Sequence, residues 1–248
     1  MSLGRIHLPV LGLFVAAGLM GALAFGLRTA RLARIDPDAF WDLGFVAAAA
    51  AFLLSRLMLV AENPHIFLQY PLAVLELPAV SAGGLLLTAL VVLWYVRRRG
   101  LPLLPVLDAA APCAAVVHCF VTLGEFAGGT REGMPAGVPW AVGSSFGRVH
   151  PVELYAAAGW VAVFALLLAL LRRRPVPGLV FAGLLVLWGI LDVVTDFFHL
   201  PGSLYANDAL DGIEWRGLEL IVLGGLLLAW RVAQRERPQP RTEVHGAI

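Results

Sequence analysis

The chain has 248 residues, of which 60% are hydrophobic and only 14% are charged, and its formal net charge is +1. A soluble domain carries roughly 25% charged residues, so this composition leaves too little polar surface for a protein surrounded by water. The sequence also lacks a basic stripe with interleaved aromatic residues, which argues against nucleic acid as a partner. The composition therefore predicts an all-α integral membrane protein.

About seven apolar segments have the roughly 20-residue length that a helix needs to cross a bilayer. They span residues 8–27, 39–60, 72–96, 106–126, 153–171, 178–199 and 217–231. The first run lacks a small-residue cleavage site and is followed by further spans, so we interpret it as a helix rather than a cleaved signal peptide. We expect one transmembrane domain over residues 1–234, with a long outer loop at 127–152. The polar residues 235–248 are expected to form a disordered tail.

Arginine residues alternate between the two ends of the predicted helices. They cluster at residues 28–34, 97–99, 172–174 and 231–241, after the first, third, fifth and seventh helices. Loops rich in arginine stay in the cytoplasm. This pattern predicts an outside N-terminus and a cytoplasmic C-terminus, which requires an odd number of spans and agrees with seven.

Two polar stripes interrupt the apolar helices, each with the spacing i, i+4, i+7 that places side chains on one helix face. They are His118, Thr122 and Glu125 in the fourth predicted helix, and Asp192, Asp196 and His199 in the sixth. Ionisable groups are costly in a membrane and often mark functional sites. Facing each other, the stripes would line an outer pocket that could relay protons or bind a divalent cation. Alternatively, they satisfy one another across the helices.

Two further features lie on the outer side. Arg56, near the outer end of the second predicted helix, either binds a lipid phosphate or extends its charge to the interface. The glycine-rich loop 127–152 contains Arg148 and His150 near its end, and long loops of this kind are often lids or binding loops.

Several motifs, in chain order, resemble the prolipoprotein diacylglyceryl transferases. The segment His150-Pro151-Val152-Glu153-Leu154-Tyr155 is similar to the His-Pro-x-x-Leu-Tyr motif of that family. Residues 133–135 and 138–142 resemble its Gly-x-Pro and Leu-Pro-Trp-x-Val segments, and residues 196–198 resemble its Glu-Phe-Phe. The resemblance implies a bacterial plasma-membrane protein that transfers a diacylglyceryl group from phosphatidylglycerol to the cysteine of a lipoprotein signal peptide. It implies substrate-binding roles for Arg56, Gly124 and Tyr155, and a transferase of this kind would use Arg148 together with Arg56 to bind phosphate.

The sequence departs from the family pattern at positions that the resemblance marks as functional. Residues of other chemistry replace a histidine, two arginines, an asparagine, two acids and a tyrosine. The substituting residues are Ala82, Thr122, Asp192, Glu125, Thr130, Ala156 and Leu11. With the arginines replaced by Thr122 and Asp192, an anionic head group is expected to meet carboxylates where the family offers guanidinium groups.

Three hypotheses follow. The first is a diverged family member that handles phospholipid at the outer leaflet, with His118, Glu125, His150, Asp192 and Asp196 as catalytic candidates. The second is an inactive subunit that binds lipid, a membrane-inserted peptide or a partner membrane protein. The third is a metal-dependent intramembrane hydrolase, with His199, Asp192 and Asp196 as ligands. Only this third hypothesis requires a metal, and none of them requires another cofactor.

Overall fold

Long helices make up most of the described structure, as predicted. The computed structural model describes residues 2–3, 6–7, 10–70, 82–129, 133–144, 147–200, 204–205 and 210–235. Within these ranges the long helices are α1 (Val10–Leu32), α2 (Pro37–Glu62), α5 (Ala82–Arg98), α6 (Leu103–Gly128), α7 (Val152–Arg172), α8 (Leu179–Asp196) and α9 (Gly212–Arg235). Their order matches the predicted spans, so the all-α membrane fold is confirmed.

Six of these helices are long and apolar enough to cross a membrane. The seventh, α5, has 17 residues and corresponds to the later part of the third predicted span. The earlier part of that span, at 72–81, lies outside the described residues. Residues 236–248, where a disordered tail is expected, also lie outside them.

A short helix and three β-hairpins lie between or before the long helices. Helix α3 (Pro64–Gln69) follows α2, and three antiparallel hairpins pair β1 (Ser2–Leu3) with β2 (Ile6–His7), β3 (Val142–Ser144) with β4 (Gly147–Val149), and β5 (Leu204–Tyr205) with β6 (Leu210–Asp211). The β3–β4 register places Val142 opposite Val149. The long outer loop therefore contains a hairpin, which the sequence pattern did not reveal.

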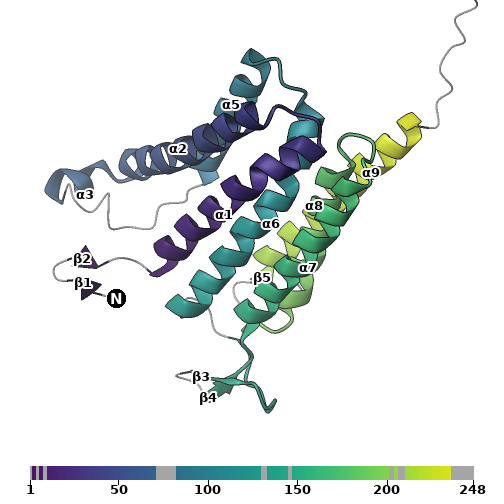
Figure 1. Cartoon of the computed structure of the whole chain (residues 1–248). Helices are drawn as coiled ribbons and strands as arrows, with labels where there is room; N and C mark the ends of the chain where they lie inside the picture. The colour runs from purple at the N-terminus through teal and green to yellow at the C-terminus, as the bar shows by residue number, and fades with distance from the viewer. Residues whose placement is uncertain are drawn as a thin grey trace, which may run out of the picture.

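The helices pack in two groups (Figure 1). Helices α1, α6, α7, α8 and α9 lie side by side, and the most extensive contacts join α8 to α9 and α1 to α6. Helices α2, α3 and α5 lie to one side of this bundle, where α2 packs on α5 and on α1. Large apolar side chains such as Leu53 on α2 and Leu226 on α9 are more than 60% exposed, as expected for surfaces that face lipid.

The arginine-rich helix ends meet at one end of the molecule. Arg99 after α5 lies 3.9 Å from Asp42 near the start of α2. The start of α8 at Gly178 approaches Arg231 near the end of α9. Because these ends share one side, the positive-inside rule identifies that side as cytoplasmic. The N-terminus is then outside, and the β3–β4 hairpin lies at the outer end (Figure 1).

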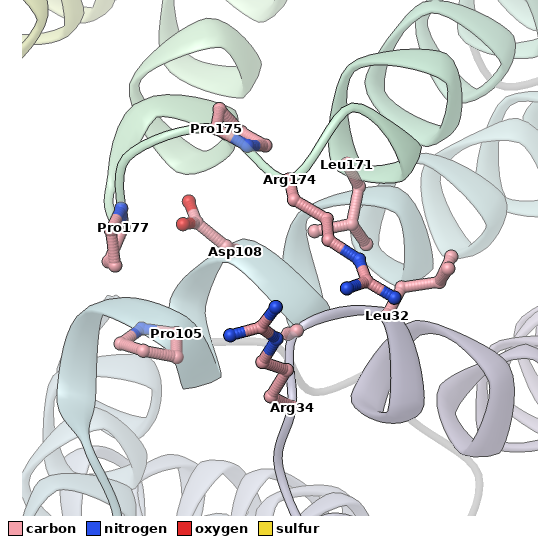
Figure 2. Close-up of a pocket in the computed structure, with 9 residues that line it drawn as sticks. Leu32, Arg34, Pro105, Asp108, Leu171, Arg174, Pro175 and Pro177 are labelled. Carbon is pink, nitrogen blue, oxygen red and sulfur yellow. The ribbon is translucent and has the colours of Figure 1, made fainter.

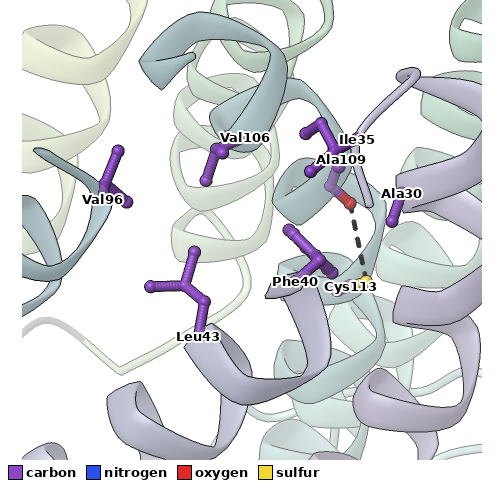
Figure 3. Close-up of a cluster of buried hydrophobic side chains, with 8 residues drawn as sticks. All are labelled: Ala30, Ile35, Phe40, Leu43, Val96, Val106, Ala109 and Cys113. Carbon is purple, nitrogen blue, oxygen red and sulfur yellow. Dashed lines mark hydrogen bonds between the residues drawn. The ribbon is translucent and has the colours of Figure 1, made fainter. Parts of the chain in front are cut away.

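A buried apolar cluster joins α1, α2, α5 and α6 near the cytoplasmic end (Figure 3). Phe40 of α2 packs against Gly26 of α1, where an added Cβ would lie 3.1 Å from its ring. Cys113 lies in the same cluster, and its thiol donates to the carbonyl of Ala109 at 3.6 Å. The cluster ties the first helices together at this end and is continuous with the bundle through α6.

A buried carboxylate connects α6 to the start of α8. Asp108 is 4% exposed. Its Oδ2 accepts the N–H of Gly178 at 2.6 Å and its Oδ1 accepts the N–H of Phe181 at 2.9 Å. The first N–H groups of a helix have no partner within the helix, so Asp108 caps α8 from a neighbouring helix. This contact fixes the position of α8 along its axis relative to α6.

Candidate functional site at the outer end of the bundle

An ion pair between α8 and α9 is the centre of the outer site. Asp192 on α8 accepts hydrogen bonds from Nε of Arg216 at 3.0 Å and from its Nη2 at 2.8 Å. The Asp192 side chain is 14% exposed, whereas that of Arg216 is 54% exposed. The carboxylate is therefore held inside the bundle, and the guanidinium reaches its surface.

Two glycines explain why these helices approach closely enough to form the pair. A Cβ added at Gly189 would lie 2.3 Å from the carbonyl oxygen of Gly217, and one added at Gly217 would lie 2.9 Å from that of Gly189. Small residues let membrane helices bring their backbones together. Asp192 follows Gly189 by about one helical turn and Arg216 precedes Gly217, so the crossing point positions both charges.

His118 lies in an aromatic enclosure on the bundle side of this pair. Its ring stacks on Trp160 of α7, with ring centroids 4.6 Å apart, and meets the edge of Trp188 of α8 at 4.2 Å. His118 thus contacts α8 at Trp188, one turn before Asp192, and the meeting of the two polar stripes stays a prediction.

The neighbouring hydroxyl and carboxylate of the α6 stripe behave differently. The Thr122 hydroxyl donates to backbone carbonyls of its own helix, at 3.1 Å from His118 and 2.9 Å from Cys119. Thr122 therefore adds no positive charge where the family resemblance implies arginine. Glu125 is partly buried near the outer end of α6.

A second polar group forms where α8 ends. Nε2 of His199 lies 3.8 Å from Glu153 Oε1, and its Nδ1 lies 3.7 Å from Asp196 Oδ1. All three side chains are at most 9% exposed. Sequence reasoning did not predict Glu153 as a site residue, since it appeared only as a position in a motif. Its place in the first turn of α7, directly after the outer loop, could have indicated that it lies near the site.

The outer loop is fastened to this end of α8 by backbone hydrogen bonds. The N–H of Met134 donates to the carbonyl of Phe198 at 2.8 Å, and the N–H of His150 donates to the carbonyl of Met134 at 3.0 Å. Gly133 forms a β-bridge with His199. A Cβ at Gly133 would lie only 2.1 Å from the carbonyl oxygen of His150, so only glycine fits in this crossing of three segments.

The His-Pro-x-x-Leu-Tyr motif presents a hydrogen-bonded pair beside that crossing. Nδ1 of His150 lies 3.2 Å from the hydroxyl of Tyr155, and that hydroxyl accepts the indole N–H of Trp140 at 2.7 Å. The ring of Phe198 packs edge-on against both His150 and Tyr155, at 5.2 and 5.7 Å. The first turn of α7 and the end of α8 therefore fix the orientation of His150.

The Arg148 side chain forms its hydrogen bonds within the outer loop. Its Nη2 donates to the carbonyls of Val138, Pro139 and Ala141 at 3.3, 2.9 and 3.2 Å. Three carbonyls on one guanidinium nitrogen hold the β3–β4 hairpin against the preceding turn. A role of Arg148 in binding phosphate stays a prediction, and its recorded contacts assign it to the loop.

Two other predicted substrate-binding residues lie apart from the ion pair. Gly124 is buried against α1, where a Cβ would lie 2.9 Å from that of Phe14 and 3.0 Å from the Leu11 side chain. Leu11 thus fills the place where the resemblance implies a tyrosine. Arg56 lies on α2, with its guanidinium 5.1 Å from the Phe52 ring centroid. Helix α2 belongs to the group beside the bundle (Figure 1).

The hypothesis of a metal site is not supported by this arrangement. Asp192 is bound by Arg216, while His199 contacts Asp196 and Glu153. Over the part of the chain that the structure describes, no group of three or more His, Cys, Asp or Glu side chains could hold a metal ion. In the described structure, Asp192 and His199 of the proposed ligand set have different partners, and the set with Asp196 stays a prediction.

Fold and site together define a multi-pass membrane protein with a polar site at its outer face. The sequence model of the prolipoprotein diacylglyceryl transferase family matches residues 1–230, and the chain belongs to this family. It is a protein of the bacterial plasma membrane, as its relatives are, and the resemblance inferred from the motifs is confirmed.

Curated relatives match nearly the whole chain. The chain is 29% identical to a phosphatidylglycerol–prolipoprotein diacylglyceryl transferase of Pseudomonas paraeruginosa, with 97% of the chain and 95% of the relative covered. It is 30% identical to the protein of the same name from Xylella fastidiosa, covering 98% and 95%. A relative of this name from Verminephrobacter eiseniae is 30% identical, covering 79% and 75%.

The contacts of Arg148 lead to a first testable prediction. In an Arg148→Gln variant, amide hydrogen exchange in residues 133–144 should become about five- to tenfold faster, because the loop loses donors that hold three of its carbonyls. Hydrogen–deuterium exchange mass spectrometry of the purified protein measures this directly. Arg173→Gln, which removes an exposed charge at the other end, is the control. Unchanged exchange in Arg148→Gln would show that the loop does not depend on this side chain.

Proposed function

We propose that this chain is a diacylglyceryl transferase of the outer leaflet in which Arg216 binds the phosphate of the donor lipid. The observation that carries the proposal is the Asp192–Arg216 ion pair at the outer end of α8 and α9. The names of the relatives specify phosphatidylglycerol as one substrate and a prolipoprotein as the other. We extend both substrates to this chain.

The geometry of Arg216 suits a phosphate ligand. Its Nε and Nη2 both donate to one oxygen of Asp192, and Nη1 carries two further N–H donors. The planar guanidinium group recognises phosphate through paired, charge-assisted hydrogen bonds. Asp192 would therefore fix the orientation of Arg216, and the exposed edge of the Arg216 guanidinium group would bind the lipid head group.

This arrangement changes the interpretation of the substituted family positions. Asp192 stands where the resemblance implies an arginine, and the sequence alone predicted repulsion between this carboxylate and an anionic lipid. Arg216 compensates the negative charge of Asp192 from the adjacent helix, so the pair is neutral overall. A phosphate that approaches from outside meets the guanidinium first, because Arg216 is the more exposed partner.

In the proposed reaction, the sulfur of the acceptor cysteine attacks the carbon of the diacylglyceryl group that is bonded to the phosphate oxygen. The C–O bond breaks, an S–C thioether bond forms, and glycerol phosphate leaves with the electron pair. Arg216 would stabilise the negative charge on the leaving phosphate. The thiol must lose its proton to a base within hydrogen-bond reach.

We propose His150 as this base. It lies at the outer end, held by Tyr155 and Phe198, whereas His118 is enclosed by Trp160 and Trp188 within the bundle. With its proton on Nδ1, His150 donates to the Tyr155 oxygen, which can accept from Trp140 as well. Nε2 is then the nitrogen that can take the thiol proton.

The central test of the proposal is a transfer assay on the purified full-length protein. With phosphatidylglycerol and a fluorescent lipoprotein signal peptide, the wild type should form the thioether product. Arg216→Gln should lower the rate roughly 100- to 1,000-fold, the usual effect of removing one group that stabilises a developing charge. Arg28→Gln, which removes an exposed arginine at the cytoplasmic end, should leave the rate unchanged. Equal rates for Arg216→Gln and wild type would refute the role of Arg216.

The two histidines can be distinguished in the same assay. His150→Gln should lower the rate about 100- to 10,000-fold, as expected for the loss of a general base. His118→Phe keeps an aromatic ring between Trp160 and Trp188 and should lower the rate less than about tenfold. The reverse order, with His118→Phe inactive and His150→Gln active, would assign the base to His118.

A non-catalytic, lipid-binding subunit is the second candidate. Two observations favour it. The Thr122 hydroxyl donates to carbonyls of its own helix, and Leu11 packs on Gly124. Neither side chain offers the charge or the hydroxyl that the family resemblance implies at its position. A folded wild-type protein that retains phosphatidylglycerol but forms no thioether, beside an active family enzyme, would establish this alternative.

A further inference from the structure

A second charged site lies at the opposite, cytoplasmic end of the bundle, away from the outer site. A pocket of about 230 Å³ opens between the ends of α1 and α7 and the starts of α6 and α8. Arg34 and Arg174 line it together with Asp108, and Leu32 and Leu171 form part of its apolar wall. Figure 2 shows the two arginine side chains entering from different walls, after α1 and after α7.

Both arginines occupy backbone positions that usually belong to glycine. Arg34 has φ of 59° and Arg174 has φ of 52°, the only non-glycine residues with positive φ in the described ranges. Each ends a helix, with N–H bonds that return to Arg31 and Leu171. Glycine is the favoured residue at such left-handed helix ends, and other residues there cost of order 1 kcal/mol or more. The chain thus carries guanidinium groups where glycine would make a more stable backbone.

The carboxylate of the pocket is already committed to the fold. Both oxygens of Asp108 accept N–H groups at the start of α8. Within the described residues, the side chains of Arg34 and Arg174 have no hydrogen bond or ion pair. Two guanidinium groups and one carboxylate therefore line this small space, which leaves a net positive charge that an anion can compensate.

The size and position of the pocket indicate which anion. Pockets that enclose drug-sized ligands have roughly 300–1,000 Å³, so a space of about 230 Å³ suits a head group rather than a whole lipid. The pocket lies where the helices meet the cytoplasmic interface, and basic pockets between membrane helices on that side bind anionic head groups.

We propose that Arg34 and Arg174 bind a phosphate group, carried by an anionic phospholipid of the cytoplasmic leaflet. This site is distinct from Arg216, which lies at the outer end. Its occupancy would connect the end of α1 to the end of α7 through the lipid phosphate. The inference does not depend on whether the outer site is catalytic.

Native mass spectrometry of the full-length protein, titrated with dioleoyl phosphatidic acid in a neutral detergent, tests the proposal. The Arg34→Gln/Arg174→Gln variant should bind one lipid about tenfold more weakly than the wild type. The matched control is Arg31→Gln/Arg173→Gln, which removes the same charge from exposed neighbours outside the pocket lining. Lipid bound at the outer site is common to all three proteins and cancels in the comparison.

Inorganic phosphate, without lipid, forms the second arm. A phosphate affinity that falls in the pocket variant and equals the affinity for phosphatidic acid would support the site but assign it to soluble phosphate. Equal lipid binding by wild type, pocket variant and control would overturn the proposal. So would the same loss in the pocket variant and in the control, because binding would then follow net charge alone.

A glycine variant separates loss of binding from loss of folding. Arg34→Gly/Arg174→Gly keeps the left-handed backbone and removes both guanidinium groups, so its thermal unfolding midpoint without lipid should equal or exceed that of the wild type. Its binding of phosphatidic acid should fall as in the glutamine variant. Wild-type lipid binding in this folded variant would also refute the proposal.

Discussion

The outer site depends on one constraint, that a charge near the apolar part of a membrane must have a partner. Asp192 meets this constraint through Arg216, and the pairing is available because Gly189 and Gly217 let α8 and α9 cross closely. The same crossing determines how far the guanidinium projects from the bundle. The site therefore follows from helix packing, since neither charge would hold this position on an isolated helix.

The two ends of the bundle solve different electrostatic problems. At the outer end, carboxylates and histidines lie within the bundle, and His199 is held between Glu153 and Asp196. At the cytoplasmic end, Asp108 neutralises the start of α8, and the surrounding arginines extend into the interface. This polarity orients the protein in the membrane. It also separates the outer site, which we propose for lipid transfer, from the inner pocket, which we propose for binding a lipid phosphate.

Hydropathy and arginine spacing were enough to predict the helices and their orientation, because both are properties of single segments. The predicted span at 178–199 agrees within three residues with the observed bounds of α8 (Leu179–Asp196). The partners of the charged residues could not be predicted in this way. Arg216 stands three residues before Glu219 on one helix, yet it binds Asp192 on another. Arg148 donates to loop carbonyls, a contact that the sequence does not reveal, and its role in binding substrate stays a prediction. The contacts of both arginines depend on tertiary packing.

The most direct test of the account moves the guanidinium between helices. In the transfer assay, Arg216→Gln should be nearly inactive, and the double variant Arg216→Gln/Asp192→Arg should recover activity, because α8 then supplies the arginine that the family resemblance implies there. Recovery to within about tenfold of the wild-type rate would confirm that the cation, rather than the particular helix that carries it, is what the site requires. An inactive double variant that folds and binds phosphatidylglycerol normally would contradict that claim.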